Sequence, residues 1–136
     1  MDAAALSDFL RREFHQVAAD FSVESVDAEG MTLRLRVGDR HLRAGGTVSG
    51  PALFALADVA FYLALLSRIG PQALAVTTSC NIDFLRKPAG DADVIGAARV
   101  LKLGRRLAVG DVMLMQGGQL VARASLTYAI PSAPAA

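Results

Sequence analysis

Apolar residues follow two different periodicities along this chain, and these divide its first third into a helix and a hairpin. Between residues 4 and 18 the apolar side chains recur at the spacing of an amphipathic helix, at Leu6, Phe9, Leu10, Phe14 and Val17. Residues 20–28 and 31–37 instead alternate apolar and polar positions, which is typical of strands. Gly30 lies between them and is predicted to form the turn of a β-hairpin.

The most apolar stretch, residues 50–69, predicts a helix that is hydrophobic on every face. Pro51 suits the first helical position, where its missing N–H costs nothing, and Ser49 or Gly50 suits the N-cap. The helix is predicted to end before Gly70. The apolar run is too short and too interrupted for a membrane span, so we expect the helix to lie at the centre of the fold.

Four strand-like stretches follow the long helix. Glycines at 104, 117 and 118 separate the later ones, and this spacing predicts consecutive antiparallel pairing in a four-strand meander. The stretches are residues 73–84, 91–103, 106–115 and 119–130. An antiparallel sheet curled around one buried helix satisfies this order, which is the α+β hotdog fold in a single domain over residues 1–130. Residues 131–136 are predicted to be a disordered tail.

Composition excludes several classes of protein. A formal net charge of +1, no Trp and only two Tyr give no indication of a nucleic-acid partner. The apolar fraction of 53% is high enough to predict a buried oligomer interface in addition to a core. The single cysteine, Cys80, fits a reducing compartment, and the N-terminus has no secretory pattern. We therefore expect a cytoplasmic homo-oligomer with neither nucleic acid nor a membrane as its partner.

The candidate chemistry lies on the long helix. Asp58 is the one carboxylate within it, and burying an unpaired carboxylate costs several kcal/mol. The helix start at Ser49 and Gly50 offers free N–H groups and a partial positive charge, and Gly45 and Gly46 allow close approach of a ligand. An N–H of this kind can stabilise an oxyanion, while a carboxylate can act as general base or nucleophile. Together they suit attack on an acyl carbonyl.

Helix geometry adds a constraint. Gly50 and Asp58 are eight residues apart, or about 12 Å along the axis, so one carbonyl cannot easily touch both in the same chain. Two antiparallel helices from two chains would bring them together, which predicts a site between protomers. The alternatives remain open: Asp58 can instead cap a neighbouring loop, and Ser49 and Gly50 can serve only as caps. Tyr62, on the same face as Asp58, either orients a water or packs in the core.

Three segments resemble the hotdog-fold acyl-CoA thioesterases of the phenylacetate-degradation (PaaI) type. They are GGTVSGPALFALADVAFYLAL, TTSCNIDFLRKPAGD and ARVLKLGRRLAVGDV, and the similarity covers roughly residues 20–130. The resemblance implies hydrolysis of a small or medium, aliphatic or aryl acyl-CoA to a free acid and coenzyme A, without a cofactor. It also implies a homodimer with the site at the subunit interface, and we expect two such dimers to pair.

The resemblance assigns roles to individual residues. It implies that Asp58 is nucleophile or general base and that the Gly50 N–H polarises the thioester carbonyl from the other subunit. Coenzyme A would lie along the subunit surface. Asn81, Phe84 and Arg86 belong to the family-like block NIDFLRKPAGD, in which Arg86 and Lys87 would meet the pantetheine or phosphate end.

The chain also departs from the family pattern at the helix start. Ser49 and Pro51 replace the histidine and second glycine of a His-Gly-Gly motif, so the oxyanion donor must be Gly50 or Ala52. Arg43 stands where an Asn or Gln is usual. An arginine there can bind a carboxylated acyl group or a phosphate, or it can face solvent.

Other interpretations of the sequence remain. The basic turn formed by Lys102, Arg105 and Arg106 can bind the nucleotide phosphates of coenzyme A or can be a solvated turn. A non-catalytic acyl-CoA-binding protein is an alternative to the enzyme. A hotdog dehydratase or hydratase is another, but it needs a histidine beside the acid, and His41 is poorly placed for that role.

Overall fold

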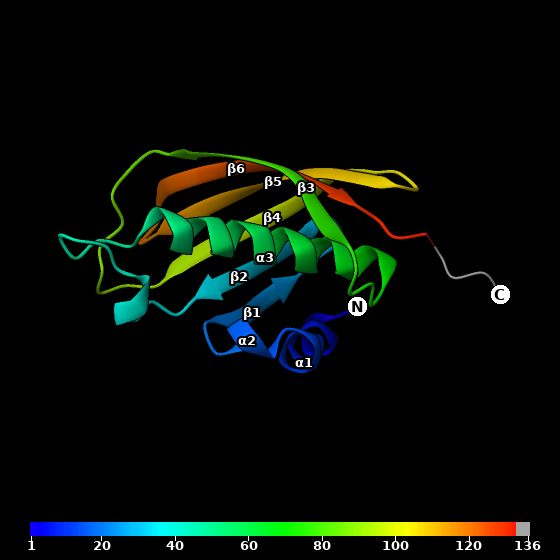
Figure 1. The fold of residues 1–136 in the computed structure, drawn as a ribbon, viewed down its shortest axis with the longest axis horizontal. Coiled ribbons are helices and arrows are strands. Elements are labelled where there is room, and N and C mark those ends of the chain that lie inside the picture. The colour runs from blue at the N-terminus through cyan, green and yellow to red at the C-terminus, as the bar shows by residue number, and fades with distance from the viewer. Residues whose placement is uncertain (133–136) are drawn as a thin grey trace.

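The computed structural model describes residues 1–132 of the chain. It contains three α-helices, one short 3-10 turn at Asp39–His41 and one six-stranded sheet (Figure 1). The helices are α1 (Ala3–Glu13), α2 (His15–Ala18) and α3 (Gly50–Ile69). The strands are β1 (Phe21–Val26), β2 (Gly30–Leu35), β3 (Val76–Phe84), β4 (Val94–Leu103), β5 (Leu107–Gln116) and β6 (Gln119–Ala129). Of the tail predicted to be disordered, Pro131 and Ser132 have no regular secondary structure, and 133–136 lie outside the described residues.

The sheet is antiparallel throughout, with strand order β1-β2-β4-β5-β6-β3. It curls around α3, which confirms the predicted hotdog fold (Figure 1). The predicted four-strand meander is wrong in one respect: β4, β5 and β6 pair consecutively, but β3 pairs with β6 and β4 pairs with β2. β3 and β4 do not pair because no tight turn joins them: the connection runs from Phe84 to Val94 and contains Pro88. Only a short hairpin turn would require consecutive strands to be neighbours in the sheet. β1 and β3 therefore form the two edges of the sheet.

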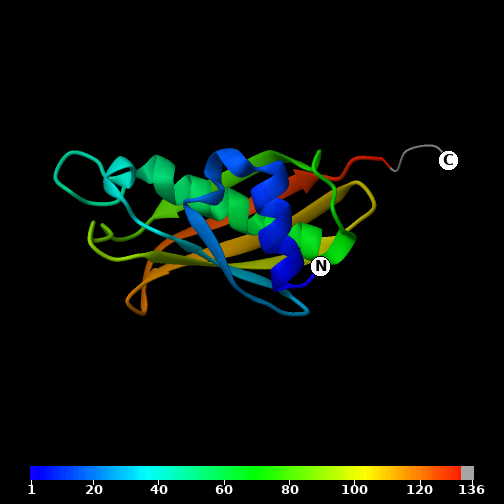
Figure 2. The same ribbon diagram turned by 90° about the horizontal axis from the view of Figure 1, so that it is seen from below.

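The helix expected over residues 4–18 is interrupted at Phe14, which has φ −133° and ψ 45°. α1 ends there and the short α2 begins in a new direction. The break allows the Phe14 ring to pack edge-on against Tyr62 of α3, with ring centroids 6.3 Å apart. α1 itself packs against β1 and α3 (Figure 2). Tertiary packing of one aromatic side chain thus overrides a continuous helical periodicity.

Gly30 is not the hairpin turn that the sequence predicts, because it is the first residue of β2 and pairs with Arg99. A Cβ at this position would overlap the backbone carbonyl of Ala98, so the close approach of two strands requires glycine. The turn is made by Asp27, whose side chain accepts hydrogen bonds from the N–H groups of Glu29 and Gly30. This is the turn chemistry typical of aspartate.

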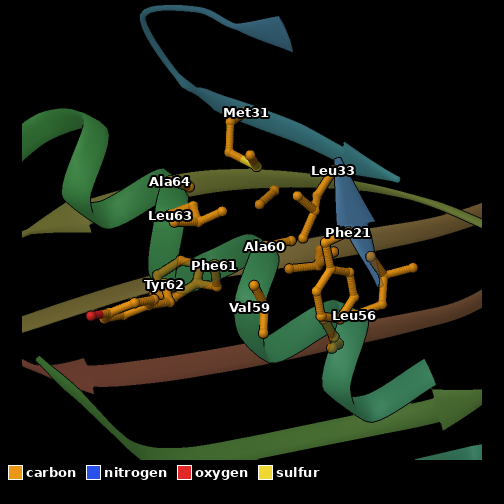
Figure 3. Close-up of a cluster of buried hydrophobic side chains, with 14 of the residues drawn as sticks. Phe21, Met31, Leu33, Leu56, Val59, Ala60, Phe61, Tyr62, Leu63 and Ala64 are labelled. Atoms are coloured by element: carbon orange, nitrogen blue, oxygen red, sulfur yellow. The ribbon is translucent and has the colours of Figure 1, made fainter. Parts of the chain in front are cut away.

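α3 is the core helix of the fold, as predicted. By length and composition it could cross a membrane, but 61% of its most apolar window is buried inside this structure. Leu56, Phe61 and Leu63 of α3 are fully buried. Figure 3 shows them among Met31 and Leu33 of β2 and other apolar side chains of the core. Since the core surrounds α3, this helix holds any polar group it carries in a fixed position.

Candidate active site

Asp58, in the middle of α3, is held by hydroxyl groups from two strands. Thr77 Oγ1 of β3 donates to Asp58 Oδ1 at 2.5 Å. The Tyr128 hydroxyl of β6 lies 2.7 Å from the same Oδ1 and 3.1 Å from the Asp58 backbone carbonyl oxygen. Thr77 and Tyr128 are directly opposite each other in the β3–β6 ladder. One cross-strand pair therefore clamps one carboxylate oxygen.

The other carboxylate oxygen, Oδ2, is left free for chemistry. Within residues 1–132, no donor reaches Asp58 Oδ2, and it is not among the polar side-chain atoms sealed from solvent. No backbone N–H donates to this side chain either, so the loop-capping alternative for Asp58 is wrong for the part of the chain that the structure describes. An oriented carboxylate with one open oxygen is suited to act as a base or a nucleophile.

Burial and the charge of Asp58 both raise the pKa of Tyr128, burial being the larger cause. The phenol therefore stays protonated at neutral pH, as a donor to Asp58 must be. Tyr128 and Thr77 were not identified from the sequence, where Thr77 fits a strand by propensity alone. Neither residue lies at a sequence spacing from Asp58 that would have predicted its contact with the carboxylate.

A cavity of about 340 Å³ opens beside Asp58, and we call it the Asp58 cavity. Its walls are the aromatic rings of Phe14, Tyr62 and Tyr128, together with small residues around Ala73. The Tyr62 hydroxyl donates to the Ala73 carbonyl oxygen at 3.0 Å. Tyr62 therefore lines the cavity as a wall, and its described hydrogen bond is to the backbone rather than to a group beside Asp58. The cavity is lined by two carboxylates, Asp58 and Glu13, and by aromatic and aliphatic side chains that suit the acyl part of a ligand.

A second cavity, of about 710 Å³, opens at the start of α3, and we call it the Gly50 cavity. Arg43, Arg86 and Lys87 bring three positive charges to it, and Phe84 lies against Gly50. A cationic cavity at a helix N-terminus suits phosphate groups.

The first turn of α3 leaves one N–H available in the Gly50 cavity. Ser49 is the N-cap, with its Oγ accepting from the Ala52 N–H at 3.2 Å. Pro51 has no N–H, and the Leu53 N–H is bonded to the Ser49 carbonyl oxygen. Within the described residues the Gly50 N–H has no acceptor, so it is the free donor of this turn. Ser49 serves as the cap that the sequence allowed.

The structure separates the remaining predicted ligand-binding residues from these two cavities. Gly46 lies in the preceding loop with φ 80°, and Asn81 is exposed on β3. Lys102, Arg105 and Arg106 are exposed at the β4–β5 hairpin and line neither cavity. Their assignment to ligand binding stays a prediction. Within residues 1–132, no three His, Cys, Asp or Glu side chains are grouped to hold a metal ion.

Comparison with known proteins identifies the family. The sequence model of the thioesterase superfamily matches residues 45–123, a range that contains Gly50, Asp58 and Thr77. This chain belongs to the thioesterase superfamily. A proposed esterase of Pseudomonas aeruginosa is 35% identical over 102 residues, which are 74% of this chain and 75% of that protein.

Solved structures of the thioesterase superfamily agree with this membership. A proposed thioesterase of a Silicibacter species is 49% identical, with a TM-score of 0.90 over 97% of this chain and 93% of that one. A mutant of the phenylacetic acid degradation protein PaaI from Thermus thermophilus is 33% identical, with a TM-score of 0.77 over 86% of this chain and 99% of that one. The resemblance to PaaI-type thioesterases is thus confirmed, and thioester hydrolysis is the general activity that these relatives support.

Proposed function

We propose that this protein hydrolyses acyl-CoA thioesters with a small or medium, aliphatic or aryl acyl group. The observation that carries the proposal is Asp58 itself, a carboxylate that lines a cavity and is held by Thr77 and Tyr128 through Oδ1, with Oδ2 unbonded within the described residues. Membership in the thioesterase superfamily supports the reaction class. The aromatic and aliphatic side chains among the lining residues support an acyl group beside Asp58.

In the proposed reaction, Asp58 Oδ2 either attacks the thioester carbonyl or takes a proton from a water that attacks it. The Gly50 N–H stabilises the negative charge that develops on the carbonyl oxygen. The C–S bond then breaks, and in the general-base route the sulfur leaves as coenzyme A thiol with the proton that Asp58 took from the water. If Asp58 itself attacks, the C–S bond breaks to leave a mixed anhydride on Asp58, and the thiolate takes a proton from solvent. A water then hydrolyses the anhydride, which releases the free acid and restores the Asp58 carboxylate. One water is consumed for each free acid and thiol formed, and no cofactor is required.

We propose that two chains share each site, because Gly50 and Asp58 open into different cavities of one chain. β3 is an edge strand, and its end residues Val76 and Phe84 are 55% and 54% exposed. β3 of one chain could pair antiparallel with β3 of a second chain, related by a two-fold axis near the middle of the strand. This pairing would set Thr77 opposite the partner's Phe84. Thr77 contacts Asp58, and Phe84 lies against Gly50, so this pairing would bring Asp58 towards Gly50 of the partner subunit.

In this dimer, the Gly50 cavity is the proposed path of coenzyme A. Arg43, Arg86 and Lys87 would meet its pantetheine and phosphate end. Arg43 lines the cationic cavity, which favours the phosphate role over the carboxylated acyl group. We further propose that two dimers pair, because the apolar fraction of 53% is high. We also propose a cytoplasmic location, because a single cysteine fits a reducing compartment.

One observation weighs against a dehydratase or hydratase. His41 lies outside the Asp58 cavity and is buried, with Nδ1 accepting a hydrogen bond from the Gly38 N–H at 2.8 Å. Its Nε2 is 3.5 Å from Asp20 Oδ1. Burial lowers the pKa of His41, and the charge of Arg40 adds to this effect. His41 is therefore a structural residue of the loop before α3.

The test of the proposed function is release of coenzyme A thiol, followed with a thiol reagent, from short, medium and aryl acyl-CoA esters. Turnover with one ester class preferred is the expected result. Tight binding of acyl-CoA with no thiol release would instead support a non-catalytic binding protein. Absence of both binding and release across all three classes would contradict the acyl-CoA proposal.

Tyr128→Phe is expected to lower kcat about tenfold while changing KM little, because the carboxylate loses one of two hydroxyls that orient it. It is also expected to lower the free energy of unfolding by about 1 kcal/mol, the usual net value of one hydrogen bond. Steady-state kinetics and urea denaturation measure the two effects. Tyr62→Phe is the matched control, since its hydroxyl donates to Ala73 and not to Asp58. Equal kcat losses in the two variants would contradict the positioning role of Tyr128.

A further inference from the structure

The break between α1 and α2 carries a second carboxylate to the Asp58 cavity. α1 ends at Glu13, and the non-helical Phe14 follows it. Glu13, Phe14 and Gln16 all line the cavity, facing α3 and the start of β3. A continuous helix over this segment would present a different set of side chains. The N-terminal segment therefore forms a wall of the space beside Asp58.

The size and lining of the Asp58 cavity limit what can enter it. The Phe14 and Tyr62 rings meet edge-on at 6.3 Å, and the Tyr62 and Tyr128 rings lie 6.1 Å apart at 31°. These three aromatic walls line a space of about 340 Å³ together with small side chains such as Ala73 and Ala75. Such a space has room for a short acyl chain or one aromatic ring.

The charges that line the cavity all have the same sign. Asp58 and Glu13 contribute two carboxylates, and no Arg, Lys or His is among the described residues lining it. Arg12 is 4.0 Å from Glu13, but its Nε is bonded to Asp8 at 3.1 Å and its side chain is exposed. Its compensation of Glu13 is therefore weak.

The charge of Glu13 also extends into the cavity. Two effects raise the pKa of the Tyr62 hydroxyl in the cavity wall: its burial, which is the larger, and the negative charge of Glu13. Arg43, Arg86 and Lys87 line the Gly50 cavity. They would meet the coenzyme end, which all acyl-CoA substrates share, and so would not discriminate between acyl groups.

We propose that Glu13 is a specificity-determining residue that selects against acyl groups ending in a carboxylate. An anionic acyl terminus would approach two carboxylates, Asp58 and the exposed Glu13, in a cavity that no described cationic side chain lines. A neutral acyl group of the same length avoids this repulsion. The inference rests on the proposed acyl-CoA hydrolysis and defines its substrate class as uncharged acyl groups. Glu13 is not assigned a chemical step.

The test compares hexanoyl-CoA with adipoyl-CoA, which have the same chain length and differ by a terminal carboxylate. The measured quantity is the ratio of kcat/KM for hexanoyl-CoA to that for adipoyl-CoA. Glu13→Gln is expected to lower this ratio about three- to tenfold, the size expected for a partly exposed charge, and Glu13→Lys to lower it further. The shift is expected to shrink at high salt, because exposed charges are screened. A purely structural role would not have that salt dependence.

Glu29→Gln is the matched control, since Glu29 is an exposed residue at the β1–β2 turn and lines neither cavity. It removes the same charge and is expected to leave the ratio unchanged. A ratio that is the same in wild type, Glu13→Gln and Glu13→Lys would overturn the inference while leaving the proposed function intact. Failure of the wild-type protein to hydrolyse hexanoyl-CoA and adipoyl-CoA, together with failure on the short and aryl esters, would overturn the proposed function and this inference with it.

Discussion

Replacing Asp58 by Asn is expected to lower kcat for acyl-CoA hydrolysis about 10³-fold, within the range that a positioned acid–base group contributes. The amide has nearly the same shape as the carboxylate, and Thr77 and Tyr128 can still donate to its carbonyl oxygen. What is lost is the charge on the free oxygen, which can then neither take a proton nor attack a carbonyl. Thiol release under saturating substrate measures the effect.

The fold of Asp58→Asn is expected to be retained, because the replacement removes a partly buried charge without creating a void. Circular dichroism and size-exclusion chromatography check this. Asp8→Asn, which removes an exposed carboxylate of α1, is the control and is expected to keep the wild-type kcat. A folded Asp58→Asn protein with a kcat within about threefold of wild type would contradict the assigned role.

Gly50→Pro is expected to lower kcat by about 10²-fold or more, the effect of removing one oxyanion donor. Proline eliminates the N–H that is free at the start of α3. Ser49 already has the extended ψ of 156° that a residue before proline adopts, and the first helical position favours proline. Residue 50 also precedes Pro51, and a residue before proline disfavours helical backbone angles, so circular dichroism must show that the variant keeps its helix content.

Gly50→Ala is the matched variant for this experiment, because it adds a methyl group and keeps the N–H. Its Cβ would lie 3.4 Å from the Phe84 ring, which a small tilt of that ring can accommodate. We expect its kcat to exceed that of Gly50→Pro by about tenfold or more. Similar losses in both variants would show that crowding against Phe84, and not the missing donor, causes the effect.

The sequence predicts the local elements of this fold well, because their signals are local. The limits of α3 follow from Ser49 at its start and Gly70 after its end, and both act as expected. Pro51 occupies the second helical position and not the first, because Ser49 rather than Gly50 is the N-cap. The pairing of β3 with β6 is different. It joins residues such as Thr77 and Tyr128 that are far apart in sequence. Periodicity predicts which side chains of a strand face the core, but it does not predict which other strand pairs with it.

The candidate site divides in the same way. Asp58 and Gly50 stand out because one is a charge in an apolar helix and the other lies at the helix start. Tyr128 is 70 residues from Asp58, so only the sheet topology could reveal that its hydroxyl holds the carboxylate. The Phe14 break, which carries Glu13 to the Asp58 cavity, depends on packing against Tyr62 and has no signal in the helical periodicity.

A mixed dimer is the most direct test of a site shared between two chains. Asp58→Asn and Gly50→Pro chains are co-expressed with different affinity tags, and the dimer carrying both tags is purified and verified by native mass spectrometry. Each parent dimer is expected to be nearly inactive. In the mixed dimer one site carries both changes and the other carries neither, so about half of the wild-type kcat per dimer is expected. A mixed dimer no more active than its parents would contradict the shared site and place Asp58 and Gly50 of one chain in the same reaction centre.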